Sequence, residues 1–398
     1  MPTTRHLRPA AAALSALVLT AAVAGSSGSS FAAGPRSETA AAAKQKAVIS
    51  VLPAIAQPGA KPAKAKKAQV VISAAFTPAK KNRPAVLLRK SGSAWKPAGK
   101  TKTTKAGLAE FTVPTKKSTY KVAAGSFRGL PAITTKTVRS STWGKASFSD
   151  EFDGRTLSTD WSHRAQFYNP EGLRNCAKGA PAATAVSGGT LRLSVLADPA
   201  RQDLCTAHNA DGSPIGKFRY RLNGHISTEK KQDFTYGVAA ARMKFPKARG
   251  QHASFWLQPT TPRPAATTAS QGGAEIDIIE WFGDGGKQSG LTSFIYHPSK
   301  KGPVKVGGFL KQQDRFLDSK KDSWWTRYHV FSVEWTPKAY VFRIDGRETS
   351  RITEGISEVA QFPILSMLSS DYELANLGSE NLLPQHSYVD WMQIWEGR

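Results

Sequence analysis

The sequence of 398 residues predicts an all-β protein with a small sandwich domain followed by a larger one. Short apolar runs alternate with clusters of Gly, Pro, Asn and Ser along most of the chain, which is typical of antiparallel strands joined by turns. No stretch shows the sustained 3.6-residue period that an amphipathic helix requires. Aromatic residues become denser toward the C-terminus, because eight of the ten Trp residues lie at or beyond Trp161. The length allows two or three domains.

The first residues have the composition of a secretory signal peptide. Arg5 and Arg8 precede an Ala/Leu/Val run over residues 10–24, and small residues around Ala32 supply a cleavage site. We assign residues 1–33 to this leader and expect a secreted, extracellular protein. A membrane anchor would require about 20 apolar residues, and no later segment is apolar enough to span a bilayer.

Two segments of different character follow the leader. Residues 34–67 are rich in Ala, Lys and Pro, a low-complexity composition that predicts a linker. Residues 68–140 carry short apolar runs separated by turn residues, as in a small antiparallel sandwich. Through residues 84–89, 95–97 and 103–107 this segment resembles the immunoglobulin-like accessory modules of many secreted bacterial enzymes.

The formal net charge of +26 is concentrated in the N-terminal part of the chain. Residues 1–145 contain 25 Lys or Arg and only two acids, Glu38 and Glu110, whereas the remainder is close to neutral. The lysine runs lack the interleaved aromatic residues on which bases stack, so we expect no specific nucleic acid as partner. Two interpretations stay open: the lysines keep exposed sheet edges soluble, or they bind an anionic cell-wall polymer or polysaccharide.

The chain has two cysteines, Cys176 and Cys205, and secretion would place them in an oxidising compartment. We predict a disulfide between them, which closes a loop of about 29 residues and adds about 3 to 4 kcal/mol in the chain-entropy model. Neither cysteine has the C-x-x-C or histidine spacing of a zinc site.

A segment of the larger domain carries three acids in the pattern E-I-D-I-I-E, namely Glu275, Asp277 and Glu280. Strand alternation places the first two on one face and isoleucines on the other. We expect a bulge near Ile278 or Ile279 that returns Glu280 to the acidic face, so that all three carboxylates line one concave surface. Two carboxylates in a groove suit glycoside hydrolysis, with Asp277 between the pair to orient the nucleophile or tune its proton affinity.

This signature and its surroundings resemble glycoside hydrolase family 16, the β-jelly-roll β-glucanases, in the branch with an extra bulged residue. The family's other landmarks follow in order, at residues 148–154, 188–193, 236–237, 241–246, 254–257, 297, 328–337, 344–346 and 389–391. The resemblance implies a concanavalin-like jelly-roll sandwich over residues 145–398 and a retaining, endo-acting mechanism that needs no cofactor. In it Glu275 matches the nucleophile, Glu280 the acid/base and Asp277 the assisting carboxylate.

The same resemblance implies four further site residues. Trp256 matches an aromatic platform for a sugar ring, with core packing as the alternative. Trp281 would line the same groove or be buried, and His297 matches a cleft histidine that donates to a Glu or a sugar hydroxyl, unless it belongs to the core. Asp390 matches a position that holds a structural Ca²⁺ in several members, although calcium prefers six or more oxygens and no dense acidic loop is present.

The chain departs from the family pattern at two places. Where members often carry Gly-x-Trp-Pro-Ala-Phe-Trp, residues 250–256 have His252 at the first Trp and Ala253 at the Pro. The Gly-Gly-Asn-Trp loop of laminarin-cleaving members is missing, and residues 369–373 occupy that region. Both departures weaken an assignment to plain β-1,3-glucan.

We expect a secreted, monomeric endo-glycosidase whose substrate is a β-1,3- or mixed β-1,3-1,4-glucan. The alternatives are a galactanase of the agarase or carrageenase type, a transglycosylase, and a non-catalytic carbohydrate- or cell-wall-binding protein. The presence of both Glu275 and Glu280 argues against the last of these.

Overall fold

The computed structural model describes residues 44–261, 265–286 and 288–397. The expected leader, residues 1–33, and the first part of the expected linker lie outside the described residues. Within them the chain is all-β, as predicted, and the helices α1 (Ala269–Gly272) and α2 (Asp371–Leu374) are only four residues long. No helix in these ranges is long and apolar enough to cross a membrane.

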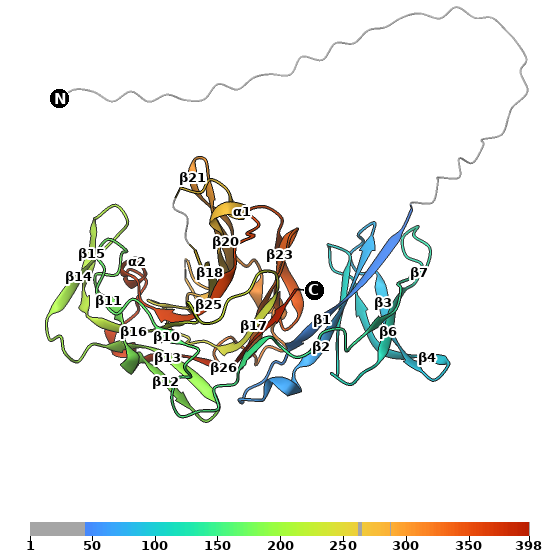
Figure 1. The fold of residues 1–398 in the computed structure, drawn as a ribbon, viewed down its shortest axis with the longest axis horizontal. Coiled ribbons are helices and arrows are strands. Elements are labelled where there is room, and N and C mark those ends of the chain that lie inside the picture. Colours follow the sequence, from blue (N-terminus) through green and yellow to red (C-terminus); the bar gives the residue numbers. More distant parts are fainter. Residues whose placement is uncertain (1–43, 262–264, 287, 398) are drawn as a thin grey trace, which may run out of the picture. The chain divides into compact units, whose positions relative to one another are not determined.

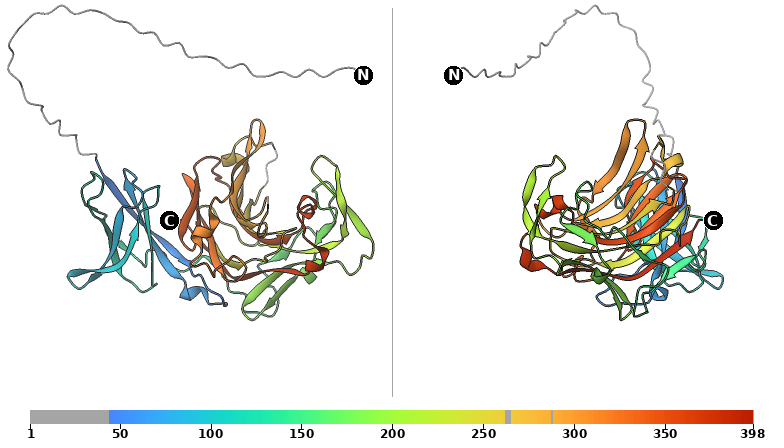
Figure 2. Two further views of the ribbon diagram at one scale, coloured as in Figure 1. Left: turned by 180° about the vertical axis from the view of Figure 1, so that it is seen from behind. Right: turned by 60° about the vertical axis from the view of Figure 1, so that its left-hand side comes forward.

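The large domain consists of two sheets joined through strand β16, which pairs with a strand of each (Figure 1). The first sheet contains, in spatial order, β21 (Gly302–Phe309), β20 (Leu291–Ser299), β19 (Glu275–Trp281), β18 (His252–Pro259), β25 (Gln361–Leu368) and β16 (Arg221–Ser227). The second contains β13 (Thr190–Ala197), β26 (Gln385–Glu396), β17 (Gly237–Lys244), β22 (His329–Thr336), β23 (Ala339–Ile344) and β24 (Arg347–Ile352). Figure 2 shows how strongly these neighbouring strands twist and curve.

Shorter elements complete this domain. They are β9 (Phe148–Asp150), β10 (Ser162–His163), β11 (Ala177–Gly179), β12 (Thr184–Ser187), the hairpin of β14 (Leu204–His208) and β15 (Pro214–Arg219), and the 3₁₀ turns η2 (Pro181–Ala183), η3 (Gln313–Phe316) and η4 (Glu380–Leu382).

An apolar core fills the space between the two sheets. Ile276 and Ile278 of β19 belong to one buried cluster with Met243 of β17, Val333 of β22 and Met392 of β26. Successive side chains of a strand point to opposite faces, so the face of β19 away from the isoleucines is available for polar groups. The core therefore determines which face of β19 carries the acids.

The small domain has two antiparallel sheets around a core of its own. One contains β1 (Lys46–Ala56), β2 (Gln69–Thr77) and β5 (Leu108–Val113), and the other contains β4 (Ala94–Lys102), β3 (Pro84–Ser91), β6 (Thr119–Ala124), β7 (Ile133–Thr134) and β8 (Val138–Arg139). Ile72, Leu87, Phe111 and Val122 meet in its core. The arrangement agrees with a small sandwich, and its immunoglobulin-like character stays a prediction.

The linker prediction is wrong for residues 46–67. Residues 46–56 form β1, which pairs with β2 from end to end, and the turn η1 (Ala65–Lys67) follows. Ile55 packs in one buried cluster with Trp391 and Trp395 of β26. The prediction relied on the overall Ala/Lys/Pro composition and gave too little weight to the Val, Leu and Ile residues of β1. Burial of these side chains stabilises the strand. Pro53, which has no N–H to donate, lies where the register of β1 shifts.

The predicted disulfide between Cys176 and Cys205 is present, with a Cα–Cα distance of 5.5 Å. Both cysteines are buried in a cluster with Leu374 of α2. The Cys176 N–H donates to Asp371 Oδ1 at 3.1 Å. The disulfide therefore supports helix α2, whose Glu373 reaches the site described next.

Candidate active site

A bulge at Ile278 shapes the strand that carries the three acids. Between β18 and β19 the register passes from Phe255 opposite Ile279 to Trp256 opposite Asp277, so Ile278 has no counterpart. The register against β20 shifts in the same stretch. The predicted bulge is confirmed, and its physical effect is to restore the alternation that two consecutive isoleucines would otherwise break.

The bulge turns Glu280 onto the face that Glu275 and Asp277 occupy. All three carboxylates line one pocket of about 550 Å³, as expected. The Ser293 hydroxyl donates to the Ile278 carbonyl oxygen at 2.8 Å, so the extra residue keeps a hydrogen bond although it has no strand partner there.

Glu280 is surrounded by hydroxyl donors and a histidine. Ser254 donates to its Oε1 at 3.3 Å and Thr292 to its Oε2 at 3.2 Å, each from the position directly opposite on a neighbouring strand. Nε2 of His252 lies 3.8 Å from Oε1. Burial raises the pKa of Glu280 above its usual value, while His252 and Thr292 oppose that rise. A raised pKa keeps a larger share of Glu280 protonated, as a general acid requires.

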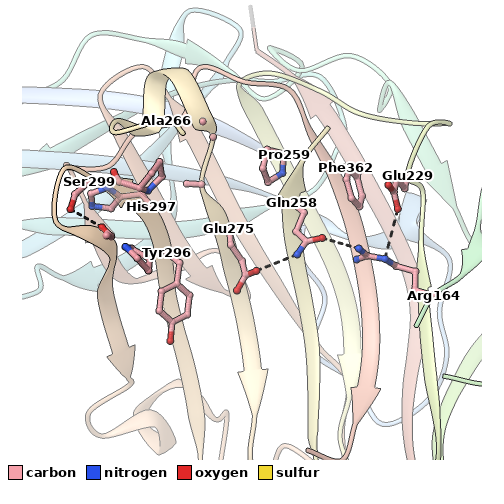
Figure 3. A pocket seen from close by; sticks show the side chains of 16 residues that line it. Arg164, Glu229, Gln258, Pro259, Ala266, Glu275, Tyr296, His297, Ser299 and Phe362 are labelled. Carbon is pink, nitrogen blue, oxygen red and sulfur yellow. Dashed lines mark hydrogen bonds and ion pairs between the residues drawn. The ribbon is translucent and has the colours of Figure 1, made fainter. Parts of the chain in front are cut away.

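Glu275 is less buried than the other two acids and is held by a row of polar side chains (Figure 3). Gln258 donates to Glu275 Oε2 at 3.3 Å and accepts from Arg164 Nη2 at 2.9 Å; Arg164 Nε in turn lies 3.9 Å from Glu229 Oε2. Burial and the charge of Glu280 raise the pKa of Glu275 above its usual value, and the Gln258 bond and the positive charges of Arg174 and Arg164 offset only part of that rise. These partners favour the ionised form that a nucleophile needs.

Asp277 lies between the two glutamates and is buried. Its Oδ2 has no hydrogen-bond partner within the part of the chain that the structure describes. Burial raises the pKa of Asp277 well above its usual value, and the charges of Glu280 and Glu275 raise it further. The three acids of the pocket thus share a raised pKa but differ in their hydrogen-bond partners.

Trp256 of β18 forms part of the pocket wall. Its indole Nε1 donates to Ser366 Oγ at 3.1 Å, which fixes the ring. The Arg164 guanidinium lies 5.7 Å from the ring centroid, and the His225 ring stacks at 6.1 Å. The ring is partly exposed, which argues against core packing, and its role as a platform for a sugar ring stays a prediction.

Trp281 is a core residue, and its assignment to the groove is wrong. The side chain is 1% exposed, its Nε1 donates to the Pro246 carbonyl oxygen at 2.6 Å, and its ring stacks on Phe245. Adjacent residues of a strand face opposite sides, so a Glu280 that points into the pocket directs Trp281 into the core.

His297 is not brought to the three acids. It lines a neighbouring pocket of about 530 Å³, which Glu275 also borders. Tyr296, the preceding residue, lies directly opposite Glu275, so alternation turns His297 away. In Figure 3 its ring lies beside Ser299, away from the Glu275 carboxylate. Its Nδ1 contacts the Pro298 carbonyl oxygen at 3.0 Å, so the expected bond to a catalytic Glu is wrong.

Asp390 does not fit a calcium site. Its Oδ2 accepts from the Arg242 guanidinium and, at 2.9 Å, from the Ala63 N–H. Both charged side chains are buried, with exposed fractions of 3% for Asp390 and 1% for Arg242. A Ca²⁺ ion bound here would face the guanidinium charge, and no cluster of three or more His, Cys, Asp or Glu suited to a metal occurs in the described ranges. The residues around Asp390 therefore do not fit a calcium ion, and the calcium assignment stays a prediction.

Sequence reasoning missed a buried pair beside Glu280. His252 Nδ1 lies 2.7 Å from Glu373 Oε1, although the two residues are far apart in sequence. Arg174 and Tyr372 border the same pocket. The sequence did contain a signal for this pair, because His252 and Glu373 belong to the two segments that depart from the family pattern.

Comparison with known proteins gives a family match and two curated relatives. The family model described as glycosyl hydrolases family 16 matches residues 194–393. The chain is 24% identical over 177 residues to Gram-negative bacteria-binding protein 1 of Drosophila melanogaster, covering 40% of this chain and 32% of that protein. It is 24% identical over 211 residues to glucan endo-1,3-beta-glucosidase A1 of Niallia circulans, covering 51% of this chain and 29% of that protein. The chain thus spans about a third of the length of these relatives.

Two of the solved structures that align with this chain are a laminarinase catalytic domain and an endo-beta-1,3-glucanase. The laminarinase catalytic domain of Thermotoga maritima aligns with a TM-score of 0.48 at 18% identity, covering 64% of this chain and 99% of that one. The endo-beta-1,3-glucanase of Pyrococcus furiosus aligns with a TM-score of 0.49 at 18% identity, covering 63% of this chain and 94% of that one.

Proposed function

We propose, from the premise that the chain belongs to glycosyl hydrolase family 16, that it is a secreted endo-glycosidase which hydrolyses a β-1,3- or mixed β-1,3-1,4-glucan with retention. The observation that carries the proposal is the presence of Glu275 and Glu280 in one pocket with different partners. The Niallia circulans relative, named as a glucan endo-1,3-beta-glucosidase, supports the substrate class. The disulfide between Cys176 and Cys205 supports an extracellular location, because such bonds persist in oxidising compartments.

The proposed reaction has two steps that begin and end with the same protonation states. In the first, Glu280 donates its proton to the glycosidic oxygen while a Glu275 oxygen bonds to the anomeric carbon, and the bond between that carbon and the glycosidic oxygen breaks. In the second, the ionised Glu280 takes a proton from water, whose oxygen attacks the anomeric carbon and displaces Glu275. Two inversions at one carbon retain its configuration.

Digestion of a substrate panel tests this proposal. We expect laminarin and lichenan to be cut into oligosaccharides, with the β-anomer appearing first in the NMR spectrum of the products. Cleavage of agarose or carrageenan alone would replace the glucanase proposal by a galactanase, and products longer than an oligosaccharide substrate would indicate a transglycosylase. If no member of the panel is cut, the glucanase proposal is wrong.

Replacing Trp256 by Ala is expected to lower kcat/KM for the glucan by about tenfold, the upper end of what one aromatic contact contributes. The loss should appear mainly in KM, because the ring holds substrate without exchanging a proton with it. Trp256→Phe, which retains an aromatic face, should recover most of the affinity. Steady-state kinetics on laminarin measures both variants, and an unchanged KM for Trp256→Ala would contradict the platform role.

The small domain, we further propose, holds the enzyme on a phosphate-bearing anionic wall polymer. Residues 44–145 contain 22 Lys or Arg and a single acid, Glu110. Strand β4 lies at the edge of its sheet and exposes Lys96, Lys100 and Lys102. Lysines along one open edge match a repeating row of negative charges.

Co-sedimentation of the full chain with such a polymer tests this role. Reversing Lys96, Lys100 and Lys102 to Glu is expected to weaken binding roughly tenfold or more at low salt, and added salt should weaken wild-type binding. Reversing Lys311, Lys320 and Lys321, which are exposed on the large domain, changes net charge by the same amount and serves as the control. Equal losses in both triple variants would contradict a binding surface at β4.

A further inference from the structure

A buried histidine stands between the candidate acid/base and a second glutamate. His252, the first residue of β18, has Nδ1 2.7 Å from Glu373 Oε1 and Nε2 3.8 Å from Glu280 Oε1. A carboxylate only accepts hydrogen bonds, so the short contact places a proton on Nδ1. The His252 ring stacks on Phe282 at 5.2 Å, which fixes its plane.

Glu373 is held so that it cannot turn away from His252. It is the third residue of helix α2, and its Oε2 accepts the Ser370 N–H at 2.7 Å as half of a capping box. Its Oε1 remains for the imidazole. The helix is in turn supported by Asp371, which accepts the N–H of Cys176 at 3.1 Å. One oxygen of Glu373 therefore anchors the helix and the other anchors the histidine.

We infer that His252, held by Glu373, is a positioning residue that keeps a positive charge beside Glu280 and thereby sets the pH range in which Glu280 exchanges protons. This inference rests on the proposed function, since it assigns a task to the surroundings of the proposed acid/base. It also explains why the two departures from the family pattern occur together: the histidine of one segment and the glutamate of the other bond to each other.

The neighbouring charges agree with a protonated His252. Burial alone lowers the pKa of His252, but the charge and hydrogen bond of Glu373 and the charge of Glu280 outweigh it, and the net shift is upward. Arg174 opposes the rise. His225, whose own pKa is lowered well below its usual value by burial, adds no competing positive charge at neutral pH.

The sign of the expected pH effect follows from these contacts. A cation 3.8 Å from Glu280 favours the ionised form of Glu280 and lowers its pKa. The charge of Lys305 lowers this pKa by a smaller amount, and the charge of Glu373 raises it. The general acid must be protonated in the first step, so ionisation of Glu280 produces the alkaline limb of kcat/KM. Removing the imidazolium should raise the pKa of Glu280 and move that limb to higher pH.

The test compares pH profiles of kcat/KM for wild type, His252→Gln and Glu373→Gln on the glucan that the wild type cleaves. We expect the alkaline limb to move up by about one pH unit in His252→Gln. The shift in Glu373→Gln should have the same direction but be smaller, because the charge of Glu373, which itself raises the pKa of Glu280, is lost together with the imidazolium. His386→Gln removes a histidine whose Nδ1 bonds Ser194 instead of a pocket residue, and its profile should match the wild type. A loss of rate at every pH without movement of the limb, or movement to lower pH, would show a merely structural role and overturn the inference.

The charge of His252 can also be measured by NMR, without an activity assay. In NMR spectra of protein labelled with ¹⁵N-histidine, the signal absent from His252→Gln identifies His252. It should remain an imidazolium above pH 6.5 in the wild type and titrate at lower pH in Glu373→Gln. A neutral His252 at pH 6 would overturn the inference even if the glucan is cut, whereas an imidazolium in a protein that cuts no glucan would count against the proposed function alone.

Discussion

Replacing Glu275 by Gln is expected to abolish glucan hydrolysis without unfolding the protein. The amide keeps the size of the side chain and an oxygen for the bond from Gln258 Nε2, so the pocket should persist. An amide oxygen is too weak a nucleophile to form the glycosyl-enzyme ester. We therefore expect kcat to fall on the order of 10⁴-fold or more, as when the nucleophile of other hydrolases is removed. Release of reducing ends from laminarin at equal protein concentration measures the loss.

Two comparisons make this result specific. Glu354 is an exposed acid outside the pocket, and Glu354→Gln should retain wild-type activity. Glu280→Gln should lose about 10²- to 10⁴-fold on polysaccharide but much less on an aryl glycoside whose leaving group needs no proton. Hydrolysis that survives Glu275→Gln, or a loss at Glu275 that an activated leaving group rescues, would contradict the assignment of the nucleophile.

The shape of the acidic strand was predictable because its sequence does not fit the regular alternation of a β-strand. Glu275 and Asp277 alternate with Ile276 and Ile278, but a second isoleucine then shifts Glu280 by one position. Only a bulge reconciles three acids on one face with an apolar core on the other, and the register of β18 and β19 has it. The same reasoning, carried one residue further, would have placed Trp281 in the core.

Other features depended on contacts that local patterns do not specify. The composition of residues 34–67 indicated a linker, yet the apolar side chains of β1 find partners on β26, far along the chain. His252 and Glu373 are likewise distant in sequence, and only the folded domain brings them together. Asp390 was assigned by resemblance alone, and its actual partner is the buried Arg242. Family patterns locate the reacting acids here, whereas long-range packing determines their partners.

Replacing Asp390 by Asn is expected to lower the free energy of unfolding by about 3 to 5 kcal/mol, because it leaves the buried Arg242 guanidinium without its counter-charge. The guanidinium also donates to the carbonyl oxygens of Gln57 at 2.7 Å and Lys61 at 3.1 Å, so the loss should loosen residues 57–61 as well. Urea unfolding monitored by tryptophan fluorescence measures the change. Asp203→Asn breaks an ion pair with Arg201 at the protein surface, where water screens both charges, and should cost much less.

The chelator EDTA and a double variant separate this ion pair from a metal site. If Arg242 alone balances Asp390, EDTA should leave the unfolding midpoint of the wild type unchanged. The variant that carries Arg242→Met and Asp390→Leu together should recover most of the stability lost in Asp390→Asn, because two apolar side chains leave no buried charge uncompensated. A midpoint that falls with EDTA in the wild type, with little effect of Asp390→Asn, would instead indicate a cation at Asp390. We expect EDTA to have no effect, because the Arg242 guanidinium in contact with the Asp390 carboxylate repels Ca²⁺ from the same oxygen.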